Sequence, residues 1–112
     1  MHRLFVIGDS ISQQIGPYLQ EMVSSRYTLD RKREGQVDDG MHANGGDSSH
    51  VLNYLRWLEQ SDLPRPDLLL VNCGLHDIKV DTETGDIQVP LDGYRQNLYG
   101  IVELARRVAD RL

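Results

Sequence analysis

The hydrophobic positions of the chain alternate between short apolar runs and longer stretches with helical spacing. Residues 4–7 (Leu-Phe-Val-Ile) and residues 68–71 (Leu-Leu-Leu-Val) are continuous apolar runs, which are typical of buried parallel strands. A more polar strand is predicted at residues 27–29 (Tyr-Thr-Leu), at an edge of the sheet. From residue 91 onward apolar positions recur at alternating spacings of three and four, which predicts a helix whose apolar stripe continues to Leu112.

Two further helices are predicted between the strands. The apolar positions within residues 11–23 have helical spacing, but Gly16 and Pro17 interrupt it. We therefore expect one loose turn and then a regular helix with Pro17 in its first turn. Any of residues 47–49 (Asp-Ser-Ser) can cap the next helix, whose apolar face lies within residues 51–58.

These elements predict one α/β domain over residues 1–112. A small hairpin is expected within residues 78–89, around Thr-Gly-Asp at residues 84–86. Strands that alternate with helices favour a three-layer α/β/α, flavodoxin-like parallel sheet with helices on both faces. Right-handed crossovers place the first strand in the centre, with the second and third strands beside it.

The end of the pattern predicts an incomplete sheet. The third strand is apolar on both faces, yet no fourth strand follows it, which would leave an apolar sheet edge exposed. The apolar stripe of the last helix is still present at Leu112, without a glycine or proline stop signal. We expect the domain to be truncated after the third strand and its helix. The alternative is a partner chain that covers the edge, for example in a homo-oligomer.

Composition narrows the classes of function. Charged residues make up 26% of the chain and the net charge is −5, which favours neither nucleic acid nor an acidic membrane as a partner. The basic residues 31–33 (Arg-Lys-Arg) are expected on a solvated strand edge. The single Cys73 cannot form an internal disulfide, and residues 4–7 are too short for a signal-peptide core. We expect a cytoplasmic protein, unless a leader precedes the sequence.

Polar and glycine-rich segments follow each predicted strand. They are residues 8–10 (Gly-Asp-Ser), residues 44–48 (Asn-Gly-Gly-Asp-Ser) and residues 72–77 (Asn-Cys-Gly-Leu-His-Asp). Taken singly, they have ordinary interpretations as a helix cap, a flexible loop and a turn. The carboxyl ends of parallel strands share one edge of a sheet, where α/β proteins bind ligands. The sequence therefore predicts that the three segments meet there.

The order of these segments resembles the first three sequence blocks of the SGNH (GDSL-type) serine hydrolases. In that family the blocks are Gly-Asp-Ser, a Gly-Asp turn and Gly-x-Asn-Asp, and the resemblance covers nearly the whole chain. It implies the SGNH type of α/β/α fold and hydrolysis of small acyl esters, carbohydrate acetyl esters among them, without a cofactor. Ser10 would be the nucleophile that carries the acyl group.

The resemblance also implies roles for the residues around Ser10. The backbone N–H groups of Ser10 and Gly46 would bind the oxyanion, together with the side chain at position 76. Asp9, Asn44 and Asp77 would support the site. The sequences to which these residues belong are Gly8-Asp9-Ser10, Asn44-Gly45-Gly46-Asp47 and His76-Asp77.

Two features depart from the family pattern. His76 replaces the asparagine that donates to the oxyanion; an imidazole N–H can still donate, and loss of one such donor costs about two to three powers of ten in rate. The family's late Asp-x-x-His, which supplies the general base, is missing, since no histidine follows Leu98. We expect little activity from these residues alone. His42, His50 or a partner chain are the alternatives for the base.

Other interpretations stay open. A flavodoxin-like module without catalysis could bind an anion at a helix N-terminus or assemble through its third strand. A metal site drawn from the acidic loop is disfavoured, because its residues lack a tight ligand spacing. The residues of that loop are Asp38, Asp39, His42, Asp47 and His50. We assign no catalytic role to Cys73.

Overall fold

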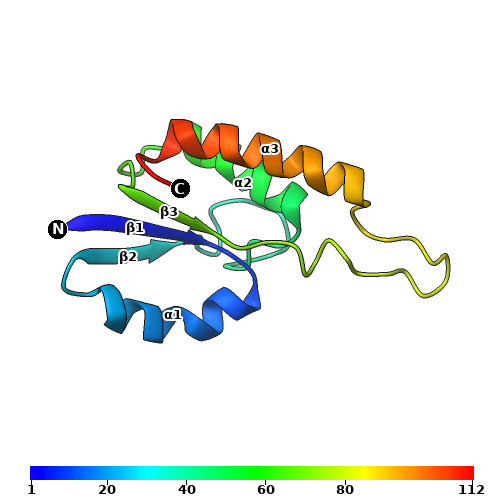
Figure 1. Ribbon diagram of the computed structural model, residues 1–112, viewed down its shortest axis with the longest axis horizontal. Helices are drawn as coiled ribbons and strands as arrows, with labels where there is room; N and C mark the ends of the chain where they lie inside the picture. The colour runs from blue at the N-terminus through cyan, green and yellow to red at the C-terminus, as the bar shows by residue number, and fades with distance from the viewer.

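The computed structural model describes all of residues 1–112 and contains a three-stranded parallel sheet (Figure 1). The strands are β1 (His2–Ile7), β2 (Tyr27–Arg31) and β3 (Leu68–Val71). Their order in the sheet is β2-β1-β3, and both pairs of neighbours are parallel. This confirms the predicted central position of the first strand.

Helices cover both faces of the sheet (Figure 1). α1 (Ser10–Val23) lies on one face, while α2 (Ser48–Gln60) and α3 (Leu91–Val108) pack against each other on the other face. The prediction of a small α/β domain is confirmed, and the arrangement is compatible with a flavodoxin-like fold. The longest helix, α3, has 18 residues with charges along it, and none of the three helices has the length and apolar character needed to span a bilayer.

The hydrophobic core lies between the sheet and the α2–α3 pair. Phe5 and Leu69 contribute to it from the sheet. The ring of Tyr54 on α2 stacks on Phe5 with 6.3 Å between ring centroids. Trp57 also stacks on Tyr54, with 5.5 Å between ring centroids. Because consecutive strand side chains point to opposite faces, only every second residue of β3 can enter this core.

The third strand is therefore less buried than its sequence predicted. Leu69 is 2% exposed, but Leu70 is 40% exposed on the opposite face, because α1 packs against β2 and leaves β3 uncovered. The outer edge of β3 is partly paired: the N–H of Leu69 donates to the carbonyl of Arg111 at 2.9 Å, and the Arg111 N–H donates to Asp67 at 3.0 Å. β3 is thus the edge strand that the sequence predicted, but burial on both of its faces was wrong, and an isolated bridge to Arg111 covers part of the edge.

Helix α1 is continuous, which corrects the predicted break at Gly16-Pro17. Pro17 lies inside the helix, where it removes one intrahelical hydrogen bond. The carbonyl that loses its donor belongs to Gln13, and both Gln13 and Pro17 are exposed. Water can therefore satisfy that carbonyl, and the helix continues past the proline.

Helix α3 ends at Val108, four residues before the predicted end of its apolar stripe. Its last carbonyl groups accept hydrogen bonds from Arg65, including one from Nη2 to the carbonyl of Ala109 at 2.9 Å. The Arg65 Nε also donates to Asp110 at 2.9 Å. The helix stop therefore comes from a residue distant in sequence and from pairing with β3, since no local glycine or proline supplies it.

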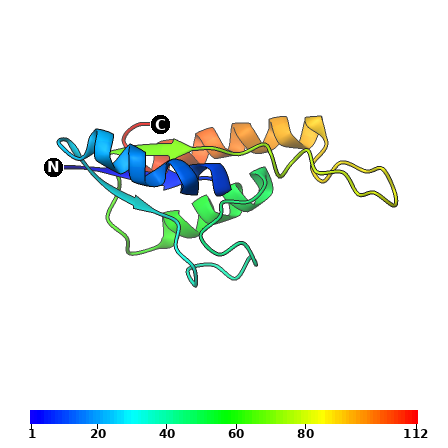
Figure 2. The same cartoon turned by 90° about the horizontal axis from the view of Figure 1, so that it is seen from below.

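The predicted hairpin is present between β3 and α3. Val80 and Ile87 form an antiparallel bridge, and the N–H of Asp81 donates to the carbonyl of Asp86 at 2.8 Å. Figures 1 and 2 show that this segment extends away from the sheet and the helices, beyond the carboxyl ends of the strands. Its base joins the loops that form the candidate site.

Candidate functional site

The three polar loops meet at the carboxyl edge of the sheet, as the topology predicted. The N–H of Gly45 donates to the carbonyl of Gly8 at 2.7 Å, which joins the second loop to the first. Asp77, in the third loop, accepts the N–H of Ser48 at 2.9 Å. A Cβ on Gly45 would lie 3.2 Å from the Gly8 backbone nitrogen. Glycine is therefore what allows the first two loops to touch.

Ser10 occupies the first position of α1, directly after the central strand. The preceding residue, Asp9, is the N-cap, and its Oδ1 accepts the N–H of Ile11 at 3.0 Å. Asp9 is buried, and its Oδ2 has no hydrogen-bond partner. Ser10 itself is exposed, and its N–H precedes the first intrahelical hydrogen bond, from Gln13 to the Asp9 carbonyl. This places a free hydroxyl beside a helix N-terminus, which favours negative charge.

A buried lysine anchors the glycine-rich loop. The side chain of Lys32 is 0% exposed, and its Nζ donates to Asp39 Oδ2 and to the carbonyl of Asn44, both at 2.7 Å. The same Nζ lies 5.6 Å from the centroid of the Tyr54 ring. The prediction that residues 31–33 form a solvated edge was therefore wrong for Lys32. Its position at the end of β2 turns it inward to hold the loop that carries Gly46.

Gly46 has a backbone conformation that suits its predicted role, but its N–H is engaged. Its φ is +73°, a value that glycine adopts without steric cost. The N–H donates to the side-chain Oδ1 of Asn44 at 2.8 Å. In this conformation the Asn44 side chain therefore occupies the N–H group that was predicted to be an oxyanion donor.

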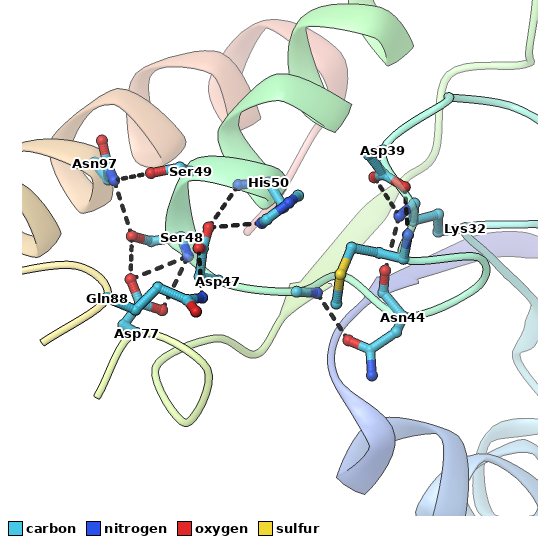
Figure 3. A network of polar contacts seen from close by, with 12 residues as sticks. Lys32, Asp39, Asn44, Asp47, Ser48, Ser49, His50, Asp77, Gln88 and Asn97 are labelled. Atoms are coloured by element: carbon cyan, nitrogen blue, oxygen red, sulfur yellow. Dashed lines mark hydrogen bonds and ion pairs between the residues drawn. The ribbon is translucent and has the colours of Figure 1, made fainter. Parts of the chain in front are cut away.

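Asp77 fixes the start of α2 through a buried network (Figure 3). Besides the backbone N–H of Ser48, its carboxylate accepts the Ser48 hydroxyl at 2.5 Å. Asn97, on α3, donates from Nδ2 to the Ser48 hydroxyl oxygen at 2.9 Å and to Ser49 at 3.0 Å. Asp77 and Ser48 are both buried. The predicted supporting residue Asp77 thus ties the third loop to both α2 and α3.

Asp47 and His50 form a second polar pair at the same helix start (Figure 3). Asp47 is the N-cap of α2, and its Oδ1 accepts both the backbone N–H and the ring Nδ1 of His50, at 2.9 and 2.8 Å. Gln88 donates to Asp47 Oδ2 at 2.9 Å. Burial acts to raise the pKa of Asp47, but these hydrogen bonds outweigh it and hold the pKa below its usual value.

We call the carboxyl edge of the sheet, with the three polar loops that meet there, the rim. His76 lies at this rim, between Cys73 and Asp77 in the sequence, and is partly exposed. The structure thus brings the predicted third oxyanion donor to the edge where Ser10 lies, without a contact between the two side chains. His42 lies elsewhere in the glycine-rich loop, where its Nδ1 is 2.9 Å from Glu34 Oε1 and its side chain is 71% exposed. His2 is at the opposite end of β1 and pairs with Asp67.

Three buried aspartate carboxylates lie beneath the surface of this rim, near Cys73. The pKa of the Cys73 thiol is raised to about 11, first by burial and then by the carboxylates of Asp77, Asp47 and Asp9. All three aspartates are at least nine-tenths buried. Cys73 is consequently a poor nucleophile, which agrees with its lack of an assigned role.

None of the five best-formed surface hollows has Ser10, Gly46 or His76 in its lining. No group of three or more His, Cys, Asp or Glu side chains is arranged to hold a metal ion.

Sequence reasoning missed Asn97 and Gln88, and it named Asp47 and His50 only separately, as a possible helix cap and an alternative base. Asn97 carried a signal, because it is a polar residue close to the apolar stripe of α3. The spacing of Asp47 and His50 is that of a helix N-cap and its third residue, where side chains meet. Gln88 gave no signal, since it lies in the hairpin and reaches Asp47 only through the fold.

Comparison with protein-family models, with curated proteins and with solved structures found no match. The resemblance to SGNH hydrolases therefore rests on the three sequence blocks.

Proposed function

We propose that this protein is a serine ester hydrolase with an SGNH-type fold, which acts on small acyl esters through an acyl intermediate on Ser10. The observation that supports this most is the position of Ser10. It is an exposed serine at the first position of a helix, directly after the central strand. The loop that carries Gly46 contacts the same turn through the Gly45 N–H.

The arrangement of Ser10, Gly46 and His76 suggests how the site would hydrolyse an ester. The Ser10 oxygen attacks the carbonyl carbon, and the carbonyl oxygen becomes an oxyanion near the N–H groups of Ser10 and Gly46. Because the Gly46 N–H now donates to Asn44, the oxyanion has to replace the Asn44 oxygen. The ring of His76 is the third donor. The alcohol then leaves, and water hydrolyses the acyl-serine to release the acid.

The charge and shape of the rim bear on the substrate class. Three buried carboxylates, those of Asp9, Asp47 and Asp77, surround Cys73 beside the site. Like charges repel strongly at low dielectric, so an anionic acyl group is disfavoured and a neutral one, such as acetyl, is favoured. The exposed position of Ser10 suits a large or polymeric alcohol, such as a carbohydrate, whose bulk stays in solvent.

The alternative is an anion-binding or assembly module without catalysis. The same carboxylates disfavour phosphate, and Asp9 already caps the N-terminus of α1. Assembly of copies through β3 remains a separate proposal, because Leu70 is exposed there. Titration calorimetry with inorganic phosphate and light scattering of the protein in solution test these two alternatives. We propose a cytoplasmic location, on the ground of the single free Cys73.

Hydrolysis of an aryl acetate tests the proposed function. We expect a slow but measurable reaction that Ser10→Ala abolishes. Ser25→Ala is the matched control, because Ser25 is also exposed and lies in the turn after α1. Equal rates for the Ser10→Ala variant and the parent protein would refute the assignment of the nucleophile.

A further inference from the structure

The ring of His50 contacts the carboxylate of Asp47, and such a contact orients a histidine for proton transfer. Its Nδ1 is 2.8 Å from Oδ1 of the buried Asp47. A carboxylate at this distance accepts the Nδ1 proton, which leaves Nε2 as the basic nitrogen. Gln88 donates to the other oxygen of Asp47 at 2.9 Å and fixes the carboxylate in turn. The ring is partly exposed, with 33% of the side chain accessible.

The ring of His50 also lies against the loop that touches the Ser10 turn. A Cβ on Gly46 would be 3.0 Å from Cβ and Cγ of His50. The neighbouring Gly45 donates to the Gly8 carbonyl, two residues before Ser10. Figure 3 shows the ring pointing away from Ser48 and Asp77, on the side of Asn44. His50 thus lies against Gly46, and the adjacent Gly45 contacts Gly8 in the turn that precedes Ser10.

We infer that the Asp47–His50 pair is the general base for Ser10, an inference that rests on the proposed function. When the Ser10 oxygen attacks the ester carbonyl, its proton passes to Nε2 of His50, directly or through one water molecule. The bond between the carbonyl carbon and the alcohol oxygen then breaks, and His50 returns the proton to the leaving alcohol. In the second half of the cycle His50 takes a proton from the water that attacks the acyl-serine and returns it to the Ser10 oxygen as the bond between that oxygen and the acyl carbon breaks. Ester and water are consumed, and acid and alcohol are formed.

The other histidines are less suited to this role. His42 is exposed and pairs with Glu34 on the loop surface, and His2 lies at the far end of β1. His76 is at the rim but has no carboxylate bonded to its ring, so nothing fixes its tautomer. His50 is the histidine of this chain whose ring is held by a buried carboxylate.

A second role of His50 has to be separated from catalysis. Its position three residues after the N-cap is where a side chain stabilises a helix start. His50→Gln is therefore the informative variant, because glutamine is favoured at this position but cannot accept a proton as a base. His42→Gln is the matched control. Circular dichroism and urea unfolding confirm that both variants stay folded.

The test is aryl acetate hydrolysis by the 112-residue protein and its two variants, with and without added imidazole. We expect His50→Gln to lower kcat by about two to four powers of ten with little change in KM, and imidazole to restore part of the rate. The His42→Gln variant should match the parent. An unchanged kcat in His50→Gln would overturn the role of His50 while leaving Ser10 as the nucleophile. A parent protein without any Ser10-dependent reaction would overturn both.

Discussion

The buried Lys32 offers the sharpest test of how the glycine-rich loop is held. Lys32→Met keeps the apolar length of the side chain but removes the ammonium group. The carboxylate of Asp39, whose side chain is 6% exposed, then loses its cation, and the Asn44 carbonyl loses its donor. Removal of one partner of a buried ion pair costs about 3–5 kcal/mol, a large part of the about 5–15 kcal/mol that stabilises a typical domain.

Urea unfolding followed by Trp57 fluorescence measures this loss. Trp57 is the only tryptophan, and it stacks on Tyr54, whose ring lies near the Lys32 ammonium. At about 4 °C per kcal/mol for a chain of this size, the melting temperature should fall by about 12–20 °C. Arg33→Met is the control: Arg33 is exposed and pairs with Asp30 at the surface, so its loss should leave the unfolding curve nearly unchanged.

The pH dependence gives a second readout of the same pair. Burial acts to raise the pKa of Asp39, but hydrogen bonds from Lys32 and the Met41 N–H lower it below its usual value. A lowered folded-state pKa stabilises the protein above the unfolded value of about 3.9, and this stabilisation is lost as pH falls through the folded value. The difference between parent and Lys32→Met should therefore shrink below about pH 4. A loss under about 1 kcal/mol at pH 7, the size expected of a surface ion pair, would refute the buried-pair reasoning.

Two further predictions concern the rim. Gly46→Ala should destabilise the protein more than Gly35→Ala, because both have a positive φ but only at Gly46 would the new Cβ meet a neighbour, His50 at 3.0 Å; equal unfolding midpoints in urea would contradict this. Cys73 should react with iodoacetamide at pH 8 on the order of 10² times more slowly in the folded than in the unfolded protein, because its pKa is raised to about 11 by burial and nearby carboxylates. A folded-state rate close to that of a free thiol, measured by mass spectrometry, would show that the thiol is not held in this environment.

The hydrophobic pattern was sufficient to predict the architecture. The element order and the hairpin near Gly85 follow from periodicity and turn residues, because these are local properties of the chain. The central position of β1 follows from the right-handed crossovers of parallel strands. The exposure of Leu70 could not be predicted in the same way. An apolar run predicts burial on both faces, but the helix that would cover that face is not supplied by these residues.

Element boundaries failed where distant residues decide them. The end of α3 at Val108 depends on Arg65, which is more than 40 residues away and donates to the last carbonyl groups of the helix. The continuity of α1 through Pro17 depends on solvent access to one carbonyl. Neither cause can be recognised from the residues that are close in sequence to the helix end or to the proline.

The candidate site was predicted in outline and corrected in detail. Topology alone brought the loops of Ser10, Gly46 and Asp77 to one edge, because parallel strands end there together. The Asn44 oxygen on the Gly46 N–H and the burial of Lys32 could not be foreseen. Both depend on the path of a glycine-rich loop that has no periodic pattern.

Covalent labelling of Ser10 tests the central claim most directly. A fluorophosphonate reacts with serines that are activated as nucleophiles, and intact-mass measurement followed by peptide mapping locates the adduct. We expect one adduct per chain, on the peptide that contains Ser10, with none on the Ser10→Ala variant and an unchanged yield on Ser25→Ala. Absence of labelling in the parent protein, or an adduct on another serine, would contradict the assignment of Ser10 as the nucleophile.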